Sequence, residues 1–344
     1  MHQTEKPILS DSKTMGLIQK NCKGKKHLKL TVGTLSGEKR IITVFDESGE
    51  VESKDYVYEI GSIGKTLTAT LLAKYVCENR MSLDDLFQNY MEGLDHSQYY
   101  PNLSRLATHT SGYGAYAPFT TRETLKLFTD MAFGRNQGLV PFNFDLERIK
   151  AFIQKQNLQD QDYKWKYSNL GYALIGHALG VVSGKGYADT MDEFLSQELG
   201  LPDTYTGIRK DKNLHGFTKK NVDCGNWDLS ENFMAPSGSI SSTAIDLLSY
   251  ARLNMQEEKP YLSLCQQKHA NASKKYDMGL GWWLHKANNK IMEHEGGTGA
   301  FGGFLIIDKD KEAAVVVLAN YRLGITSERD IGLSVLKNLQ ESHV

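Results

Sequence analysis

Three short motifs in the 344-residue chain contain side chains that could carry out acyl transfer. The first is Ser62-Ile63-Gly64-Lys65. At the start of a helix, this spacing places the serine and the lysine on one face. A buried lysine with a lowered pKa could accept the serine proton, and the helix N-terminus would stabilise developing negative charge. The motif therefore predicts Ser62 as a nucleophile and Lys65 as its partner.

The S-x-x-K pattern is weak by itself, because the chain contains further copies that begin at Ser10, Ser36 and Ser334. Those copies fall in a polar tail, at a predicted hairpin turn and on a solvated terminal helix. Only Ser62 stands between an apolar strand and an apolar helix, where its side chain could face a cleft.

A phosphate-binding loop is an alternative for the same residues, since 61–66 reads Gly-Ser-Ile-Gly-Lys-Thr. The full pattern requires a glycine five positions before Gly64, and that position is Glu59. A carboxylate there would repel phosphate, so we place the nucleotide interpretation second.

The second motif is Tyr167-Ser168-Asn169, directly before a predicted helix. A phenol can move protons when cationic neighbours lower its pKa. The amide of Asn169 could hold a lysine ammonium or a substrate amide. The alternative is that Ser168 caps the helix and Tyr167 only packs.

The third motif is His294-Glu295-Gly296-Gly297, at the end of a predicted strand. Glycines at a strand edge let a substrate backbone approach, and one amide there could form half of an oxyanion hole. The alternative is a tight hairpin with a solvated histidine. Adjacent strand side chains point to opposite faces, so residues 293–295 lack metal-ligand spacing and we expect no metal site.

The elements that must position these motifs are strands near both ends and helices between them. The early strand-like segments are 27–34, 39–45 and 55–60, which we expect to form an antiparallel meander. The late ones are 278–286, 290–295, 300–308 and 312–320, followed by a helix over 327–339. Helical periodicity covers 62–79, 121–133, 146–156, 169–183 and 187–199.

This order predicts an α+β fold, with one antiparallel sheet built from both termini, flanked by helices, and a mainly helical domain inserted in the middle. We expect a discontinuous sheet domain over 1–85 plus 235–344 and a helical domain over 86–234. The active site would lie in the cleft between them.

Composition excludes several classes of function. Lys plus Arg number 40 against 41 acidic residues, so we expect no nucleic-acid partner. No apolar run approaches the roughly 18 residues of a membrane span. The first residues lack the apolar core of a signal peptide, so the sequence as it stands predicts a cytoplasmic protein, or an extracytoplasmic one if a leader was removed.

The four cysteines form no C-x-x-C pair and predict free thiols, with Cys77 in the core.

In their order and separation, the three motifs resemble those of the serine β-lactamase and penicillin-binding-protein superfamily, specifically its class C-like branch. That branch also contains D-peptidases, esterases and acyltransferases. The resemblance extends from about residue 27 to residue 340. Three further stretches fit it, namely 106–112, 235–243 and 279–282.

The resemblance implies a β-lactamase/transpeptidase-like fold and no cofactor. Ser62 would be the nucleophile and Lys65 its helix partner. Tyr167 would act as general base in acylation and as acid toward the leaving group. His109 and the 235–243 stretch match family positions, for which we expect a mainly structural role.

The resemblance also implies a substrate-binding set. Asn169 would steady Lys65 and the substrate, His294 and Gly296 would fill the third motif, and the amides of Ser62 and Gly297 would bind the oxyanion.

Two departures from the family pattern bear on specificity. His294 stands where class C β-lactamases carry lysine, which is more usual in the peptidases and esterases of the family. Glu295 stands where carboxylate-recognising members carry threonine or serine. If Glu295 faces the cleft, it would repel anionic substrates and favour neutral or cationic ones. The alternative is that Glu295 points into solvent.

The sequence therefore predicts a serine hydrolase that acts on a small-molecule or peptide substrate through an acyl-enzyme on Ser62. The scissile bond would be an amide or ester, as in a D-amino-acid peptide, a β-lactam or a small ester, with a carboxypeptidase or esterase favoured over an efficient β-lactamase. The alternatives are a catalytically idle ligand-binding or sensor protein on this fold, and an acyltransferase. The oligomeric state is not predicted.

Overall fold

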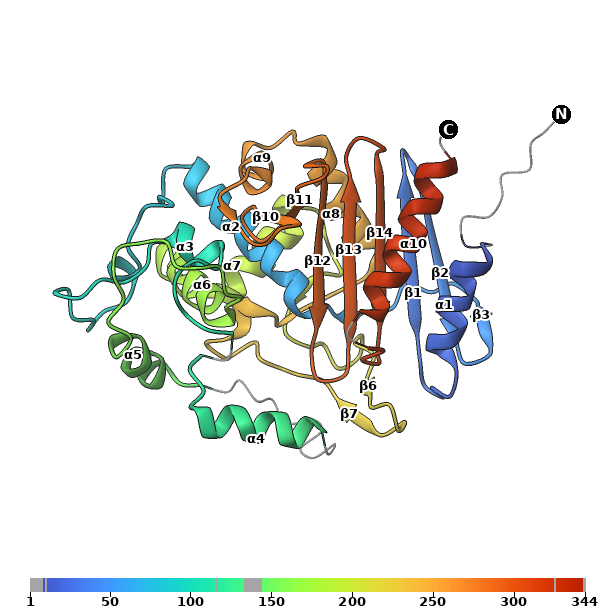
Figure 1. The fold of residues 1–344 in the computed structure, drawn as a ribbon, viewed down its shortest axis with the longest axis horizontal. Helices are drawn as coiled ribbons and strands as arrows, with labels where there is room; N and C mark the ends of the chain where they lie inside the picture. Colours follow the sequence, from blue (N-terminus) through green and yellow to red (C-terminus); the bar gives the residue numbers. More distant parts are fainter. Residues whose placement is uncertain (1–8, 10, 116, 133–143, 325, 343–344) are drawn as a thin grey trace.

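The computed structural model describes residues 9, 11–115, 117–132, 144–324 and 326–342. Its centre is a nine-stranded antiparallel sheet in the order β3-β2-β1-β14-β13-β12-β11-β10-β9 (Figure 1). The strands are β1 (Leu30–Ser36), β2 (Lys39–Asp46), β3 (Gly49–Val51), β9 (Ala270–Asn271), β10 (Tyr276–Met278), β11 (Trp283–His285), β12 (Ile291–Gly297), β13 (Gly302–Asp308) and β14 (Ala313–Ala319). Because β1 pairs with β14, the two ends of the chain form one sheet, which confirms the predicted α+β fold.

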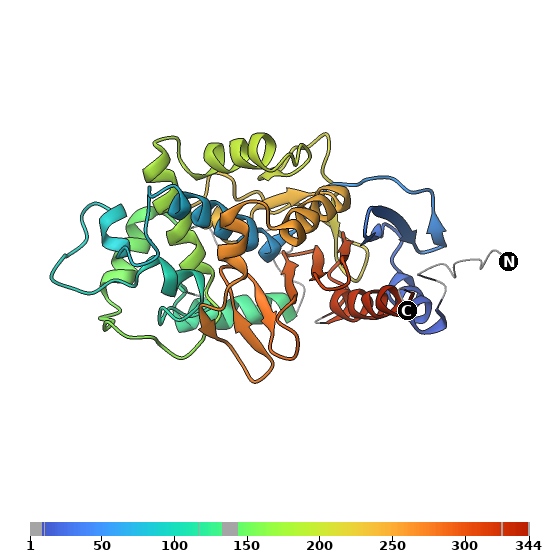
Figure 2. The same ribbon diagram turned by 90° about the horizontal axis from the view of Figure 1, so that it is seen from above.

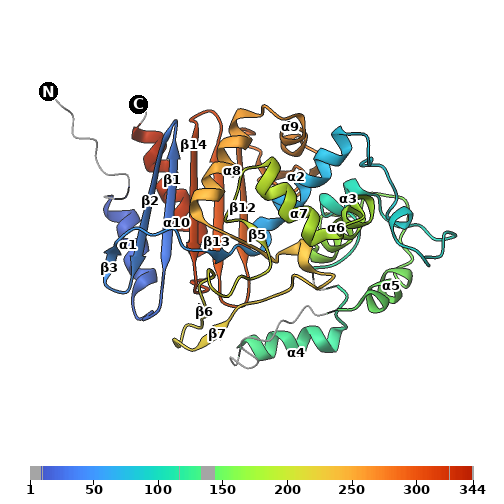
Figure 3. The same ribbon diagram turned by 180° about the vertical axis from the view of Figure 1, so that it is seen from behind.

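The sheet is covered by helices on both faces. Helices α1 (Ser12–Cys22) and α10 (Ser327–Ser342) cover one face, and α8 (Ala244–Gln256) covers the other, as the views from the front, above and behind agree (Figures 1, 2 and 3). Side chains of β13 alternate accordingly. Phe304 and Ile306 pack in the core with α1 and α10, and Leu305 and Ile307 pack in the core with α8. Since both faces are buried, β13 and β14 read as continuous apolar runs.

The remaining helices lie beside the sheet. They are α2 (Gly64–Cys77), α3 (Leu103–Ala107), α4 (Thr121–Ala132), α5 (Leu146–Gln154), α6 (Asn169–Ser183), α7 (Tyr187–Glu193) and α9 (Pro260–Gln266), with 3-10 turns at Gly61–Ile63, Phe87–Tyr90 and Ala235–Ser237 and a π-helical turn at Phe194–Glu198. Short strands complete the fold: β4 (Tyr58–Glu59), β5 (Tyr205–Thr206) and β8 (Ile240–Ser242) form one small sheet, and β6 (Gly216–Phe217) and β7 (Asp223–Gly225) form another. Among the described residues, no helix is long and apolar enough to span a membrane.

Helix α2 is the element on which the first motif depends. Every residue from 64 to 73 is buried, and α2 lies between β12 and the helices α3 and α6 (Figure 1). The three threonines of this helix are satisfied internally, since the hydroxyls of Thr66, Thr68 and Thr70 donate to helix carbonyls three or four residues earlier. The apolar core around α2 continues into the core beneath α8. Residues 86–234 carry α3 to α7, and the division into two domains remains a proposal.

Three predictions from the sequence differ from the structure. The third strand of the meander is β3, because residues 58–59 leave the large sheet and pair with β8 to bring the chain toward Ser62. Helix α1 was not predicted, since the segment reads as a polar start. Cys77 is exposed rather than buried, because it lies in the last turn of α2, where burial ends.

Candidate active site

Ser62 and Lys65 lie on consecutive turns at the start of α2. The 3-10 turn Gly61–Ile63 leads directly into the helix, so the two side chains share a face. Lys65 Nζ is 2.9 Å from Ser62 Oγ and also donates to the carbonyl oxygen of Ser237. The lysine is fully buried, and burial lowers its pKa well below the usual value. A lysine whose charged form is disfavoured by burial thus contacts the serine hydroxyl, as the sequence predicts.

Tyr167 also contacts Ser62. Ser168 caps α6 by accepting a hydrogen bond from the Gly171 amide at 3.1 Å, and this fixes Tyr167 just outside the helix. The phenol is hydrogen-bonded to Ser62, and Lys65 Nζ lies 5.1 Å from the centroid of its ring. Burial raises the pKa of Tyr167, and the bond to Ser62 offsets this only in part. Tyr167 is therefore a protonated phenol at neutral pH, in contrast to the lowered pKa expected from the sequence.

His109 supports this arrangement through contacts with Ser168 and Tyr167. Its Nδ1 accepts a hydrogen bond from the Ser168 amide at 3.1 Å, and its ring packs on that of Tyr167 with centroids 4.6 Å apart. Burial, together with the charge of Lys65, lowers the pKa of His109 well below its usual value. This contact agrees with the structural role expected for His109.

The end of β12 lies against the loop that carries Ser62. A Cβ on Gly296 would overlap the carbonyl oxygen of Ile60, and one on Gly61 would overlap the backbone nitrogen of Gly297. Gly61 also has a φ of +53°, which favours glycine. The glycines of the third motif therefore let the strand reach the nucleophile loop, which brings the backbone of Gly297 beside it.

One edge of β12 is open near Ser62. The ladder between β11 and β12 ends at the pair Trp283 and Glu293, so residues 294–297 extend beyond it. An unpaired strand edge offers backbone groups that an extended substrate can pair with.

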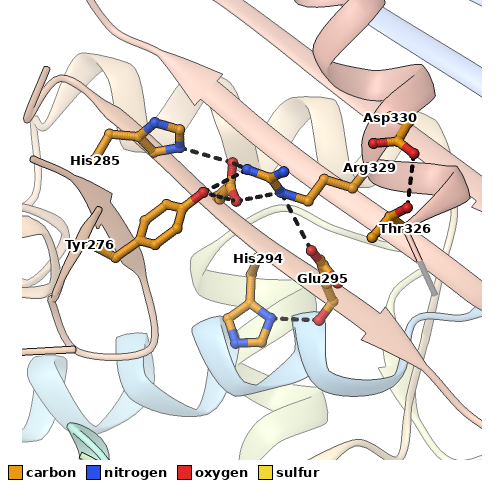
Figure 4. A network of polar contacts seen from close by, with 8 residues as sticks. Tyr276, His285, His294, Glu295, Thr326, Arg329 and Asp330 are labelled. Carbon is orange, nitrogen blue, oxygen red and sulfur yellow. Dashed lines mark hydrogen bonds and ion pairs between the residues drawn. The ribbon is translucent and has the colours of Figure 1, made fainter. Parts of the chain in front are cut away.

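His294 and Glu295 lie on opposite faces of β12. In the register with β13, His294 is opposite Leu305 and Glu295 is opposite Phe304, and these two belong to different cores. His294 is buried, and its Nδ1 is 2.6 Å from the carbonyl oxygen of Glu295. The Glu295 carboxylate lies 3.4 Å from Arg329 on α10, so the repulsion of anions expected from the sequence is offset by a cation (Figure 4).

Arg329 belongs to a network that ties α10 to β10, β11 and β12 (Figure 4). Its Nε is 2.8 Å from the buried carboxylate of Glu293, which also accepts from Tyr276 at 3.1 Å and binds His285 Nε2 at 2.9 Å. Burial raises the pKa of Glu293, but the hydrogen bonds from His285 and Arg329 outweigh it and lower the pKa overall. The network fixes the strand that carries His294.

A cavity of about 540 Å³ joins the three motifs, since Ser62, Tyr167 and residues 294–297 all line it. Arg322 also lines the cavity and donates to the carbonyl of Thr298 at 3.1 Å. A second cavity of about 610 Å³, beside Arg105 and Asn271, contains none of the predicted site residues. Among the described residues, no group of three or more His, Cys, Asp and Glu side chains could hold a metal ion.

Asn169 is the first residue of α6, and its side-chain nitrogen Nδ2 is 3.4 Å from the carbonyl oxygen of Ala115. Its contact with Lys65 remains a prediction. Ser237 could not be predicted as a partner of Lys65, although the 235–243 stretch fits the family pattern, because a backbone carbonyl leaves no signal in residue type. Arg322 and Arg329 could not be predicted either, because they belong to no motif.

Comparison with known proteins identifies relatives of this chain. The chain is 26% identical over 210 residues to a "Beta-lactamase" of Providencia stuartii (59% of this chain, 48% of that protein). It is 21% identical over 298 residues to "Penicillin-binding protein 4*" of Bacillus subtilis (77% of this chain, 60% of that protein). This chain therefore spans about half to three fifths of those relatives.

In solved structures, the fold matches "Beta-Lactamase/D-Alanine Carboxypeptidase from Pseudomonas syringae" with a TM-score of 0.74 and 17% identity, over 94% of this chain and 97% of that one. The sequence model described as "Beta-lactamase" matches residues 43–337, most of the chain. The chain therefore belongs to the Beta-lactamase family of serine hydrolases.

Proposed function

We propose that this protein hydrolyses an amide or ester through an acyl-enzyme on Ser62. The observation that carries the proposal is the contact of Ser62 Oγ with a fully buried Lys65 Nζ at 2.9 Å, while Tyr167 is hydrogen-bonded to the same serine. A candidate base and a candidate proton donor thus both contact the nucleophilic oxygen.

In acylation, Ser62 Oγ attacks the acyl carbon and its proton passes to Lys65. The backbone amides of Ser62 and Gly297 stabilise the oxyanion. The bond to the leaving group then breaks, and the leaving atom takes a proton from the Tyr167 phenol, which Lys65 restores. In deacylation, water adds to the acyl carbon and loses a proton to the same groups. The bond to Ser62 Oγ then breaks as these groups return the proton to that oxygen, and the acid is released.

The expected substrate is a small molecule or peptide, and we favour a peptidase or esterase over an efficient β-lactamase. His294 supports this preference, because it is a buried neutral group where class C β-lactamases carry a charged lysine. One relative is named a β-lactamase and another a penicillin-binding protein, and both names are consistent with acyl-enzyme chemistry. The preference for neutral or cationic substrates is not carried forward, because Arg329 pairs with Glu295.

The test is intact-mass spectrometry after incubation with a fluorophosphonate, on wild type and on Ser62→Ala. We expect a mass gain of one probe in wild type and none in the variant. ATP binding is measured alongside. An unlabelled wild type would contradict the proposal and favour the idle sensor, and ATP binding without labelling would restore the phosphate-loop interpretation. Product analysis with an added amine or alcohol separates hydrolysis from acyl transfer.

A further inference from the structure

The tautomer of His294 is fixed by its own strand. Nδ1 lies 2.6 Å from the backbone carbonyl oxygen of Glu295, and Figure 4 shows the other ring nitrogen pointing away from it. A carbonyl oxygen carries no hydrogen, so Nδ1 must be the donor. In the neutral imidazole, Nε2 is then a hydrogen-bond acceptor.

This acceptor is buried and without a partner. The side chain of His294 is 2% exposed, and Nε2 has no hydrogen-bond partner among the described residues. Lys65 donates its own hydrogen bonds to Ser62 and Ser237. A buried acceptor is costly to leave unpaired, and this one lines the cavity that Ser62 and Tyr167 share.

The acceptor state persists at neutral pH. Burial and the nearby Lys65 lower the pKa of His294 to about 3. The imidazole therefore does not become a charged donor, unlike the lysine that occupies this position in class C β-lactamases. A ligand group that satisfies it must bring a hydrogen of its own.

We infer that His294 Nε2 accepts a hydrogen bond from the N–H of a scissile secondary amide, which makes the site prefer secondary amides to esters. The inference rests on the proposed acyl-enzyme chemistry. With the carbonyl oxygen of the substrate bound by the amides of Ser62 and Gly297, the leaving nitrogen would face the rest of the cavity, which Tyr167 and His294 line. An ester oxygen has no hydrogen to donate, and neither has a β-lactam nitrogen, which is bonded to three carbons.

The step balances without another reactant. The bond between Ser62 Oγ and the acyl carbon forms, the C–N bond breaks, and the serine proton passes to Lys65. The leaving nitrogen gains one proton from Tyr167, and the N–H held by His294 departs with the amine. His294 itself neither gains nor loses a proton, so it is a specificity-determining residue and not a base.

The test compares three chromogenic substrates with one acyl group: a p-nitroanilide, its N-methyl derivative and the p-nitrophenyl ester. His294→Asn keeps an N–H near the position of Nδ1 but has no acceptor at the position of Nε2. We expect it to lower the ratio of kcat/KM for the anilide to that for either other substrate by about tenfold. His215→Asn is the matched control, because His215 pairs with Asp223 and does not line this cavity, and it should leave these ratios unchanged.

Equal loss on all three substrates in His294→Asn would overturn the inference. If that variant does not fold, the wild-type protein alone still tests the inference. The inference requires wild type to have a higher kcat/KM for the anilide than for the N-methylanilide. Fluorophosphonate labelling of wild type keeps the two proposals apart. Labelling with no anilide preference refutes only the role of His294, whereas the absence of labelling refutes the acyl-enzyme.

Discussion

The pKa of Lys65 is lowered by burial and not by a neighbouring cation. Burial is the cause of its lowered pKa, and the rings of Tyr167 and Tyr172 lie 5.1 and 5.7 Å from Nζ. A lysine amine accepts a proton only when it is neutral. The burial of Lys65 within α2 lowers its pKa and therefore sets the pH range in which Ser62 can react.

We predict that labelling of Ser62 by a fluorophosphonate slows as the pH falls. Below the lowered pKa, Lys65 is protonated and cannot accept the serine proton, so the rate should fall about tenfold per pH unit on the acid limb. Tyr167 adds no titration near neutrality, because its pKa is raised. The measurement is the second-order labelling rate across the pH range in which the protein stays folded.

Lys65→Arg is the control for this profile, because a guanidinium stays charged at every accessible pH. It should label slowly throughout, about 10²-fold or more below wild type, with no acid limb. An acid limb that persists in Lys65→Arg would show that another group accepts the proton.

What the sequence could predict at this scale was residue type and spacing. Ser62 and Lys65 follow from S-x-x-K on an apolar helix, and the contact of 2.9 Å agrees. The pKa of Tyr167 could not be predicted, because it depends on burial among groups brought from distant parts of the chain. For the same reason, the carbonyl of Ser237 could not be identified as a partner of Lys65.

Among the elements, β12 and α10 are held together by a buried ion pair. Glu293 is nearly fully buried and binds Arg329, His285 and Tyr276. Since β12 also carries His294, the position of the third motif depends on a helix that belongs to no motif.

We predict that Arg329→Ala lowers the free energy of unfolding by about 3 kcal/mol, because it leaves the buried Glu293 carboxylate without its cation. The control is Lys337→Ala on the same helix, whose pair with Glu341 is exposed and should cost less than about 0.5 kcal/mol. Denaturant unfolding of both variants measures the difference. Equal losses would mean that the network contributes no more than a surface pair.

The pH dependence of this network has a definite sign. The pKa of Glu293 is lower in the folded protein than its usual value of 4.5. Its contribution to stability is therefore present above that value and is lost as the pH falls through the folded pKa. Arg329→Ala should consequently lose less stability than wild type on acidification.

Most elements could be predicted from periodicity, and the exceptions have physical reasons. Residues 55–60 have strand character, but only 58–59 form a strand, with an isolated bridge from Val57 to Asn213, because the chain must leave the large sheet to begin α2 next to β12. Helix α1 was missed, since few of its residues are apolar and those that are buried face a single partner layer.

At the scale of the whole molecule, α1 lies in the outer helical layer and away from the active-site cavity, which α10 reaches only through its first residues, such as Arg329. Ile18 of α1 packs with Ile331 and Val335 of α10, in the core that faces away from α2 (Figures 1 and 3). Both ends of the chain contribute to this core, because β1 pairs with β14. Stability and reactivity should therefore be separable by mutation.

We predict that Ile18→Ala lowers the free energy of unfolding by about 3 kcal/mol through the cavity it leaves, with no change in the labelling rate of Ser62 while the protein is folded. Gln19→Ala, at an exposed position of the same helix, should change stability by less than about 0.5 kcal/mol. Denaturant unfolding and fluorophosphonate labelling of the same samples measure both quantities. A labelling rate that falls in Ile18→Ala well below its unfolding midpoint would mean that the sheet transmits strain from the outer layer to β12, and that the site is not independent of the N-terminal helix.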